Sequence, residues 1–278
     1  MSAPTLCGVG AILLWAFLAF AATQLSRLPP IEITALGFAI AGILSLGIVA
    51  LRGRLVLLRQ LPARAWALGL CGLAGYHVVY FAAFAQAPAV EVNLVTYLWP
   101  LMIVLFAAPL LGTRLGLGHL AGVLLGFTGC VLAIGGAARF DAAHLPGYAL
   151  GLLAALIWSL YSVLSRRLAA VPNDAVAGFC AATAIATLAL HLAVEPWVTP
   201  NAREWLVLGL LGAGPLAAAF FLWDVGMKRG DVRLIGTLAY ATPVLSTLVL
   251  MLAGVAPFGW TILLAAALVA GGGLLAAR

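Results

Sequence analysis

The stretch NLVTYLWPLMIVLFAAPLL, Asn93 to Leu111, is long and apolar enough to cross a lipid bilayer as a helix. It nevertheless begins with an amide, a hydroxyl, two large aromatic rings and a proline. A polar side chain that faces lipid is costly, so these groups are expected to face the interior of a helix bundle or a wet cavity. The stretch therefore predicts a membrane fold and the position of a site within it.

Similar apolar runs occupy the rest of the chain. Of the 278 residues, 65% are apolar and only 8% are charged, against roughly 25% charged in soluble domains. Ten runs have the length of a membrane helix, near residues 5–25, 31–51, 65–86, 91–112, 116–137, 147–168, 174–194, 204–226, 232–254 and 258–277. Each is apolar on all sides and too long for a barrel strand, so we predict an all-α integral membrane protein with ten transmembrane helices.

The basic residues divide unequally between the two sets of flanks. Eleven of the 14 lie on one set: Arg52, Arg54, Arg59, Arg64, Arg114, Arg166, Arg167, Lys228, Arg229, Arg233 and Arg278. The other set holds only Arg27, Arg139 and Arg203. The positive-inside rule makes the first set cytoplasmic, with both termini inside. The net charge of +6 is then a topology signal, and no nucleic-acid partner is expected. The first run lacks a preceding basic region and is expected to be a retained span rather than a cleaved signal peptide.

The chain also contains an internal repeat. A shift of 143 residues aligns GVGAILLW (8–15) with GLLAALIW (151–158), and TYLWP (96–100) with AYATP (239–243). We therefore expect two five-helix repeats, 1–140 and 141–278. Because five is odd, the second repeat enters the membrane from the opposite side, which is a common plan of secondary transporters with a substrate site near the midplane. A shift of 139 aligns ARAW with AREW at the start of the third and eighth runs.

Helical spacing groups the polar and aromatic residues on shared faces. The fourth run carries four of them at i, i+3, i+4 and i+7, and the third and sixth runs show the same pattern. Trp99 lies roughly 12 Å inside its span, too deep for the interfacial aromatic belt. The expected substrate-binding residues are His77, Tyr80, Asn93, Thr96, Tyr97, Trp99, Pro100, Trp158, Tyr161 and Tyr240. For Trp15 a packing role is favoured, and for Tyr240 packing and substrate contact are equally supported.

Two prolines add to this site. Pro100 and Pro243 lack an N–H, which is expected to free the carbonyls of Thr96 and Ala239 as acceptors for a substrate ammonium and to provide hinges. Aromatic faces nearby would add cation–π attraction of about 0.5 to 2 kcal/mol each. No cofactor or metal is expected, because the four cysteines are isolated and His77 has no second ligand at suitable spacing. The carboxylates fall at or near span ends, which favours a facilitator or exchanger over proton coupling.

Together these features resemble the ten-helix EamA-type carriers of the drug/metabolite transporter superfamily. Within it, YHVVYF (76–81) and TYLWP (96–100) are most similar to bacterial exporters of aromatic amino acids. The resemblance implies an inner-membrane exporter of aromatic and other neutral amino acids that works by alternating access. Many members end the fourth and ninth helices with an L-G-E signature, whereas this chain has LGT (111–113) and AGV (253–255) and so lacks that glutamate at both positions.

Other functions remain open at this stage. A multidrug or other small-metabolite exporter of the same superfamily is one alternative, although such exporters usually need a membrane-embedded carboxylate. An intramembrane enzyme is a remote one, because the chain has neither H-E-x-x-H nor G-x-G-D, and we expect no enzyme activity. Gly118, Gly122 and Gly126 predict close helix packing or dimer contacts. Ten fused helices already supply both repeats, so a functional monomer is expected.

Overall fold

The computed structural model describes residues 1–134, 138–256 and 259–277, and within these it is built from helices. The first repeat contains α1 (Ala3–Trp15), α2 (Leu18–Gln24), α3 (Pro30–Leu51), α4 (Val56–Arg59), α5 (Ala63–Leu70), η1 (Cys71–Gly75), α6 (Tyr76–Phe84), α7 (Ala89–Thr96), α8 (Trp99–Leu111) and α9 (Leu117–Ile134). The second contains η2 (Ala142–His144), α10 (Leu145–Ser165), η3 (Arg166–Leu168), α11 (Ala175–Val194), α12 (Ala202–Leu211), η4 (Gly212–Ala218), α13 (Ala219–Arg229), α14 (Val232–Leu238), α15 (Ala241–Leu252) and α16 (Trp260–Ala276).

The predicted fold class is confirmed. Nine helical segments of the described chain are 18 to 28 residues long and apolar enough to span a membrane. The tenth, α16, is apolar and has 17 residues. The predicted spans agree with these segments to within a few residues, although the end of the run at 116–137, the start of the run at 258–277 and Arg278 lie outside the described residues.

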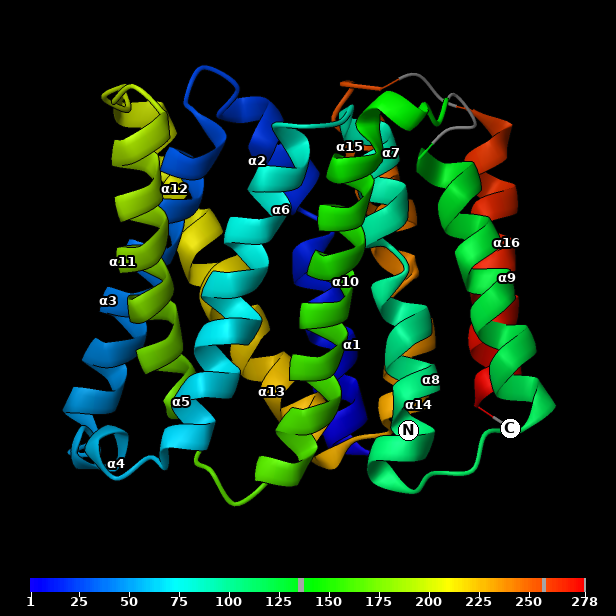
Figure 1. The fold of residues 1–278 in the computed structure, drawn as a ribbon, viewed down its shortest axis with the longest axis horizontal. Coiled ribbons are helices and arrows are strands. Elements are labelled where there is room, and N and C mark those ends of the chain that lie inside the picture. Colours follow the sequence, from blue (N-terminus) through cyan, green and yellow to red (C-terminus); the bar gives the residue numbers. More distant parts are fainter. Residues whose placement is uncertain (135–137, 257–258, 278) are drawn as a thin grey trace.

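The helices stand side by side, and the chain begins and ends on the same face of the bundle (Figure 1). We call this the terminal face. The short helix α4 lies at the same face, whereas the connection from α2 to α3 lies at the opposite face (Figure 1). An even number of crossings returns the chain to its starting side, so five-helix repeats with inverted topology fit this arrangement.

The two repeats pack against each other through equivalent helices. The second span, α3, lies along the seventh, α11, and the fifth span, α9, lies along the tenth, α16. Likewise α1 packs on α13, and its repeat counterpart α10 packs on α6. Figure 1 shows α9 and α16 together at one end of the bundle and α3 and α11 together at the other. These outer pairs flank the other six spans, several of which are broken.

Glycines allow the α9–α16 pair to approach closely, as the small-residue pattern predicts. A Cβ added to Gly122 would lie 2.5 Å from the carbonyl oxygen of Gly272, and one added to Gly118 would lie 2.9 Å from that of Leu275. Gly126 instead approaches the ring of Tyr240. The glycine stripe of α9 therefore packs inside the chain.

The proline breaks are also present. The fourth span is interrupted at Tyr97 and Leu98, between α7 and α8, and the ninth at Ala239 and Tyr240, between α14 and α15. The expectation of a free carbonyl at Ala239 is wrong, because the N–H of Thr242 donates to it at 3.1 Å. The chain turns more tightly at the break and satisfies this carbonyl with a residue three positions ahead.

Each repeat also contains one π-helical segment in its third span, which accounts for the two different repeat shifts. In the first repeat η1 separates α5 from α6, and in the second η4 separates α12 from α13. The start of α12 follows the start of α5 by 139 residues, whereas the start of α13 follows that of α6 by 143. The four additional residues are divided between α12 and the longer η4.

A buried polar cluster joins α3 to α11 at the face opposite the termini. The carboxylate of Glu195 accepts hydrogen bonds from the backbone N–H groups of Ile31 and Glu32, both at 3.2 Å, and lies 3.0 Å from Nδ1 of His191. The carboxylate of Glu32 accepts from the N–H of Val198 at 3.0 Å. Side chains from one repeat thus supply partners for backbone groups at the first turn of a helix in the other, which a helix N-terminus lacks on its own.

Replacing Glu195 with alanine should destabilise the bundle. The change leaves two N–H groups at the start of α3 and the buried His191 without their acceptor, at a cost of about 1 to 3 kcal/mol. We expect a lower apparent Tm for Glu195→Ala in detergent, measured by tryptophan fluorescence. Asp141→Ala is the matched control, because Asp141 is exposed and its side chain caps only the three-residue η2. Equal Tm values for the two variants would contradict the role of the cluster.

Two adjacent glycines of α16 provide a second test of the packing. A side chain on Gly272 would collide with the backbone of α9, whereas one on Gly271 would meet nothing within 4 Å. Gly272→Leu should therefore separate the α9–α16 pair and reduce the yield of folded protein, because the obstacle is backbone and cannot rotate away. Gly271→Leu should leave the yield close to that of the parent. Size-exclusion profiles of the two variants, expressed in parallel, make the comparison.

Candidate functional site

A cavity of about 210 Å³ lies in the middle of the bundle between the two repeats. The first, third, fourth, sixth, eighth and ninth spans supply its walls. The lining residues are Trp15, Leu18, Tyr76, His77, Tyr80, Asn93, Thr96, Tyr97, Trp99, Trp158, Leu216, Phe220 and Thr242. No lining residue of this cavity in the described chain is an Asp, Glu, Lys or Arg, so its wall carries aromatic rings and neutral polar groups.

The cavity continues into a wider space of about 540 Å³ that extends toward the face opposite the termini. The two spaces share eight residues, including His77, Tyr97 and Thr242. The outer space reaches Ala22, Pro30 and other residues at the helix ends of that face. A molecule in the central cavity can therefore reach that face.

Four tryptophans close the other side of the cavity. The ring of Trp158 lies 5.8 Å from Trp15, 6.3 Å from Trp99 and 6.0 Å from Trp223 between ring centroids. Trp223 also lies 5.0 Å from Trp15 and 5.7 Å from Trp99, and it is fully buried. We call these four residues the tryptophan floor. Rings at these distances pack edge to face or stacked and exclude water, so the floor separates the cavity from the terminal face.

Polar groups gather on the wall formed by α6 and α7. The phenol of Tyr80 donates to Oδ1 of Asn93 at 2.7 Å, and its ring stacks on Tyr76 at 5.5 Å. His77 places Nδ1 2.8 Å from the carbonyl oxygen of Leu73, which requires a proton on Nδ1. In the neutral ring Nε2 is then an acceptor. This wall presents an amide N–H₂ donor and an imidazole acceptor.

The two threonine hydroxyls on the cavity wall differ in whether they already have a hydrogen-bond partner. Thr96 donates to the carbonyl oxygen of Gly151 at 3.4 Å and so helps to hold α7 against α10. Thr242 Oγ1 is buried and has no hydrogen-bond partner among the described residues. Because it lines both the central cavity and the wider space, Thr242 offers a hydroxyl to a bound molecule.

The structure brings seven of the ten predicted site residues to the cavity wall: His77, Tyr80, Asn93, Thr96, Tyr97, Trp99 and Trp158. It does not bring Pro100, Tyr161 or Tyr240 there. Pro100 is buried at the start of α8, and Tyr161 lies under the floor, 5.3 Å from Trp158. Tyr240 is fully buried, and its hydroxyl accepts from the N–H of Leu101 at 3.2 Å, which connects the breaks of the fourth and ninth spans.

Sequence reasoning missed several lining residues. Trp15 donates through Nε1 to the carbonyl of Pro215 at 3.0 Å, as a packing role requires, but it also lines the cavity. Phe220 and Thr242 occupy the repeat positions of His77 and Trp99, a relation that was available in the sequence. Tyr76 stands in the YHVVYF motif that carried the resemblance, whereas Leu216 has no comparable signal.

This geometry suits a small molecule with an aromatic part and balanced charges. Ring faces attract an ammonium group by cation–π interaction, and amide and hydroxyl donors bind a carboxylate. An ion with a net charge would enter without a counter-charge on the wall, which a low-dielectric interior penalises. The cavity therefore favours a zwitterion or a neutral molecule.

Known proteins share this architecture. A protein of Ancylobacter novellus named aromatic amino acid exporter YddG is 48% identical over 279 residues, which cover 99% of this chain and 97% of the relative. Proteins of the same name from Salmonella typhimurium and Escherichia coli are 27% and 26% identical over 98% of the chain. A crystal structure with 48% identity superposes with a TM-score of 0.94 over 99% of this chain and 97% of its own.

The family assignment covers both halves of the molecule. The pattern described as the EamA-like transporter family matches residues 3–135 and, a second time, residues 145–278. The two matches coincide with the two sets of five spans that enclose the cavity. The chain therefore belongs to the EamA-like transporter family.

Proposed function

We propose that this protein exports aromatic and other neutral amino acids across the bacterial inner membrane by alternating access. The observation that carries the proposal is the uncharged, aromatic cavity between the two repeats, open to one face and closed to the other by the tryptophan floor. The relatives named as aromatic amino acid exporters support the choice of cargo. Transport, rather than catalysis, is the activity that we assign.

The orientation of the chain is part of the proposal. Arg52, Arg54 and Arg59 lie between α3 and α5 at the terminal face. At the same face Arg114 lies between α8 and α9, Arg166 follows α10, and Arg233 stands in the first turn of α14. By the positive-inside rule this face is cytoplasmic. The cavity is then open to the outside, and the conformation is the one from which cargo is released. We propose that a single chain suffices for transport, because both repeats contribute to one cavity.

The cargo would bind between the polar wall and the tryptophan floor. Its ammonium group would meet Nε2 of His77 and the ring face of Trp99 or Trp158, and its carboxylate would meet the amide of Asn93 and the hydroxyl of Thr242. Its side chain would pack on Tyr97 and Phe220. Pro100 and Tyr240 would act at the helix breaks and not by contact.

Counterflow in liposomes tests the function. Purified protein in vesicles loaded with unlabelled phenylalanine should accumulate labelled phenylalanine and threonine, whereas vesicles without protein should not. Cationic dyes and nucleosides form the comparison panel. Counterflow of dyes without counterflow of amino acids would replace this proposal with the multidrug alternative.

Removal of one floor ring should weaken transport. Trp99→Ala deletes a ring that lines the cavity and contacts Trp158 and Trp223. We expect the half-saturating phenylalanine concentration to rise about tenfold, corresponding to ~1.4 kcal/mol. Trp205→Ala removes an exposed tryptophan of α12 and should leave this concentration unchanged. A normal value for Trp99→Ala, with folded protein, would exclude this ring from the site.

Removing the hydroxyl of Tyr80 is a smaller change than removing a whole ring. In Tyr80→Phe, Oδ1 of Asn93 loses its donor, and the amide is free to rotate away from the cargo carboxylate. The half-saturating concentration should rise about threefold to tenfold. Tyr148→Phe deletes a hydroxyl outside the cavity and is the control. Counterflow of labelled phenylalanine at increasing concentrations measures both variants.

A further inference from the structure

Below the tryptophan floor, the half of the molecule nearer the terminal face contains buried polar side chains that the cavity does not use. Asp224 and Lys228 of α13 form an ion pair at 2.7 Å, with only 3% and 8% of each residue exposed. Tyr161 and Ser165 of α10 are buried beside them, and the buried Ser162 accepts from Nε1 of Trp223 at 3.1 Å. The helix α13 extends to Arg229, beyond the predicted span end at residue 226, so Asp224 lies about 7.5 Å inside the helix end.

The inverted repeat relates this layer to the open half of the molecule. The shift of 143 residues aligns Tyr161, Ser162, Ser165 and Asp224 with Leu18, Ala19, Ala22 and Phe81. All four of these counterparts line the wide space that opens to the outside. When two inverted repeats exchange conformations, the side that was closed adopts the arrangement of the side that was open. The polar layer should then line the opening to the cytoplasm.

The open half and the closed half of the molecule carry different kinds of side chain. The outer counterparts are apolar, whereas the closed half carries a carboxylate, an ammonium and three hydroxyls. A buried ion pair brings little net stability, and charges within a membrane span are costly. In the closed half the ammonium of Lys228 also donates to the carbonyl oxygen of Val171 at 3.0 Å. Tyr161, Ser165, Asp224 and Lys228 also line a void of about 10 Å³, close to the size of one water molecule.

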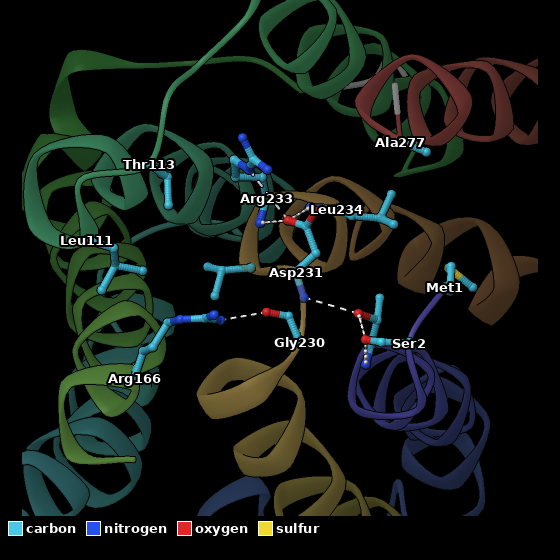
Figure 2. A pocket seen from close by; sticks show the side chains of 12 residues that line it. Met1, Ser2, Leu111, Thr113, Arg166, Gly230, Asp231, Arg233, Leu234 and Ala277 are labelled. Carbon is cyan, nitrogen blue, oxygen red and sulfur yellow. Dashed lines mark hydrogen bonds and ion pairs between the residues drawn. The ribbon is translucent and has the colours of Figure 1, made fainter.

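Contacts at the cytoplasmic face hold this layer shut. Figure 2 shows Arg166, directly after Ser165, donating to the carbonyl oxygen of Gly230 beside a pocket of about 540 Å³. The neighbouring Arg167 donates to the carbonyl of Leu110 at the end of α8 through two nitrogens, at 3.0 and 2.6 Å. The repeat counterpart of Arg166 on the open side is Thr23, which bonds within its own helix. The first contact lies within the second repeat and the second contact joins the two repeats, so both must break for this side to open.

We propose that the cytoplasmic half holds a second amino-acid site, closed in this structure, in which Asp224 receives the ammonium and Lys228 the carboxylate of a zwitterionic cargo. This inference rests on the proposed export of amino acids. Opening separates the end of α10 from α13 and α8 and frees Arg166 from Gly230. The charged pair then faces water and the cargo. The cargo moves from this layer past the tryptophan floor into the central cavity.

Thiol labelling tests whether the layer opens. Ser165→Cys is introduced into a chain whose Cys7 and Cys71 are replaced by alanine; the remaining Cys130 and Cys180 are fully buried. Among the described residues Ser165 bonds only within its own helix, to the carbonyl of Ser162, so the change is mild. In inside-out membrane vesicles, a membrane-impermeant maleimide should label this cysteine several-fold faster when Arg166→Ala is added. Arg59→Ala, an exposed arginine at the same face, should have no effect.

Transport kinetics test whether Asp224 binds the cargo. In Asp224→Asn, the half-saturating phenylalanine concentration applied from the cytoplasmic side should rise about tenfold, while the value from the outer side stays within twofold. Asp224→Glu keeps the carboxylate and should restore most of the cytoplasmic value, which separates loss of a ligand from loss of fold. Phenylalanine should also slow the labelling of the cysteine at position 165.

The outcomes are distinct. Labelling at position 165 no faster than that of the buried Cys180, with and without Arg166→Ala, would overturn the opening. Equal changes on both sides for Asp224→Asn would make the ion pair structural and overturn the site. Wild-type protein that moves no amino acid would overturn the proposed function itself, and the ligand assignment with it.

Discussion

The hydrocarbon core of a bilayer offers no hydrogen-bond partner, so each polar group within the spans must find one inside the protein or face a space that holds water or cargo. The described chain shows both solutions. Trp15 donates to Pro215, and Glu195 accepts from the first turn of α3. Thr242 Oγ1 has no partner among the described residues, and it lies on the cavity wall. The hydroxyl of Thr242 is therefore available to a molecule in the cavity.

Two copies of one fold form a single asymmetric cavity. Equivalent positions carry different chemistry: His77 corresponds to Phe220, and Tyr80 corresponds to Trp223. At these two positions the first repeat contributes hydrogen-bonding groups to the wall, whereas the second contributes rings, of which Trp223 packs into the floor.

The sequence predicted the spans and the repeat well, because length, hydropathy and repeat shifts depend on local composition and on the thickness of the bilayer. Helical spacing also identified the face that carries Asn93 and Tyr97, since the cost of exposing polar groups to lipid turns that face inward. Helical spacing could not distinguish the role of Tyr97 from that of Tyr240. Both are deep aromatic residues next to a helix break, yet one lines the cavity and the other holds two breaks together.

The sequence by itself determined that this chain crosses a membrane ten times, that its halves are inverted copies and that a polar aromatic layer lies near the middle. These properties follow from the hydrocarbon core of the bilayer, which acts on each helix separately. Only the tertiary structure decided which rings form the floor, which carbonyl Trp15 binds, and that the hydroxyl of Tyr240 accepts from the N–H of Leu101. Those contacts join residues far apart in the chain, and their distances depend on how the helices pack against one another.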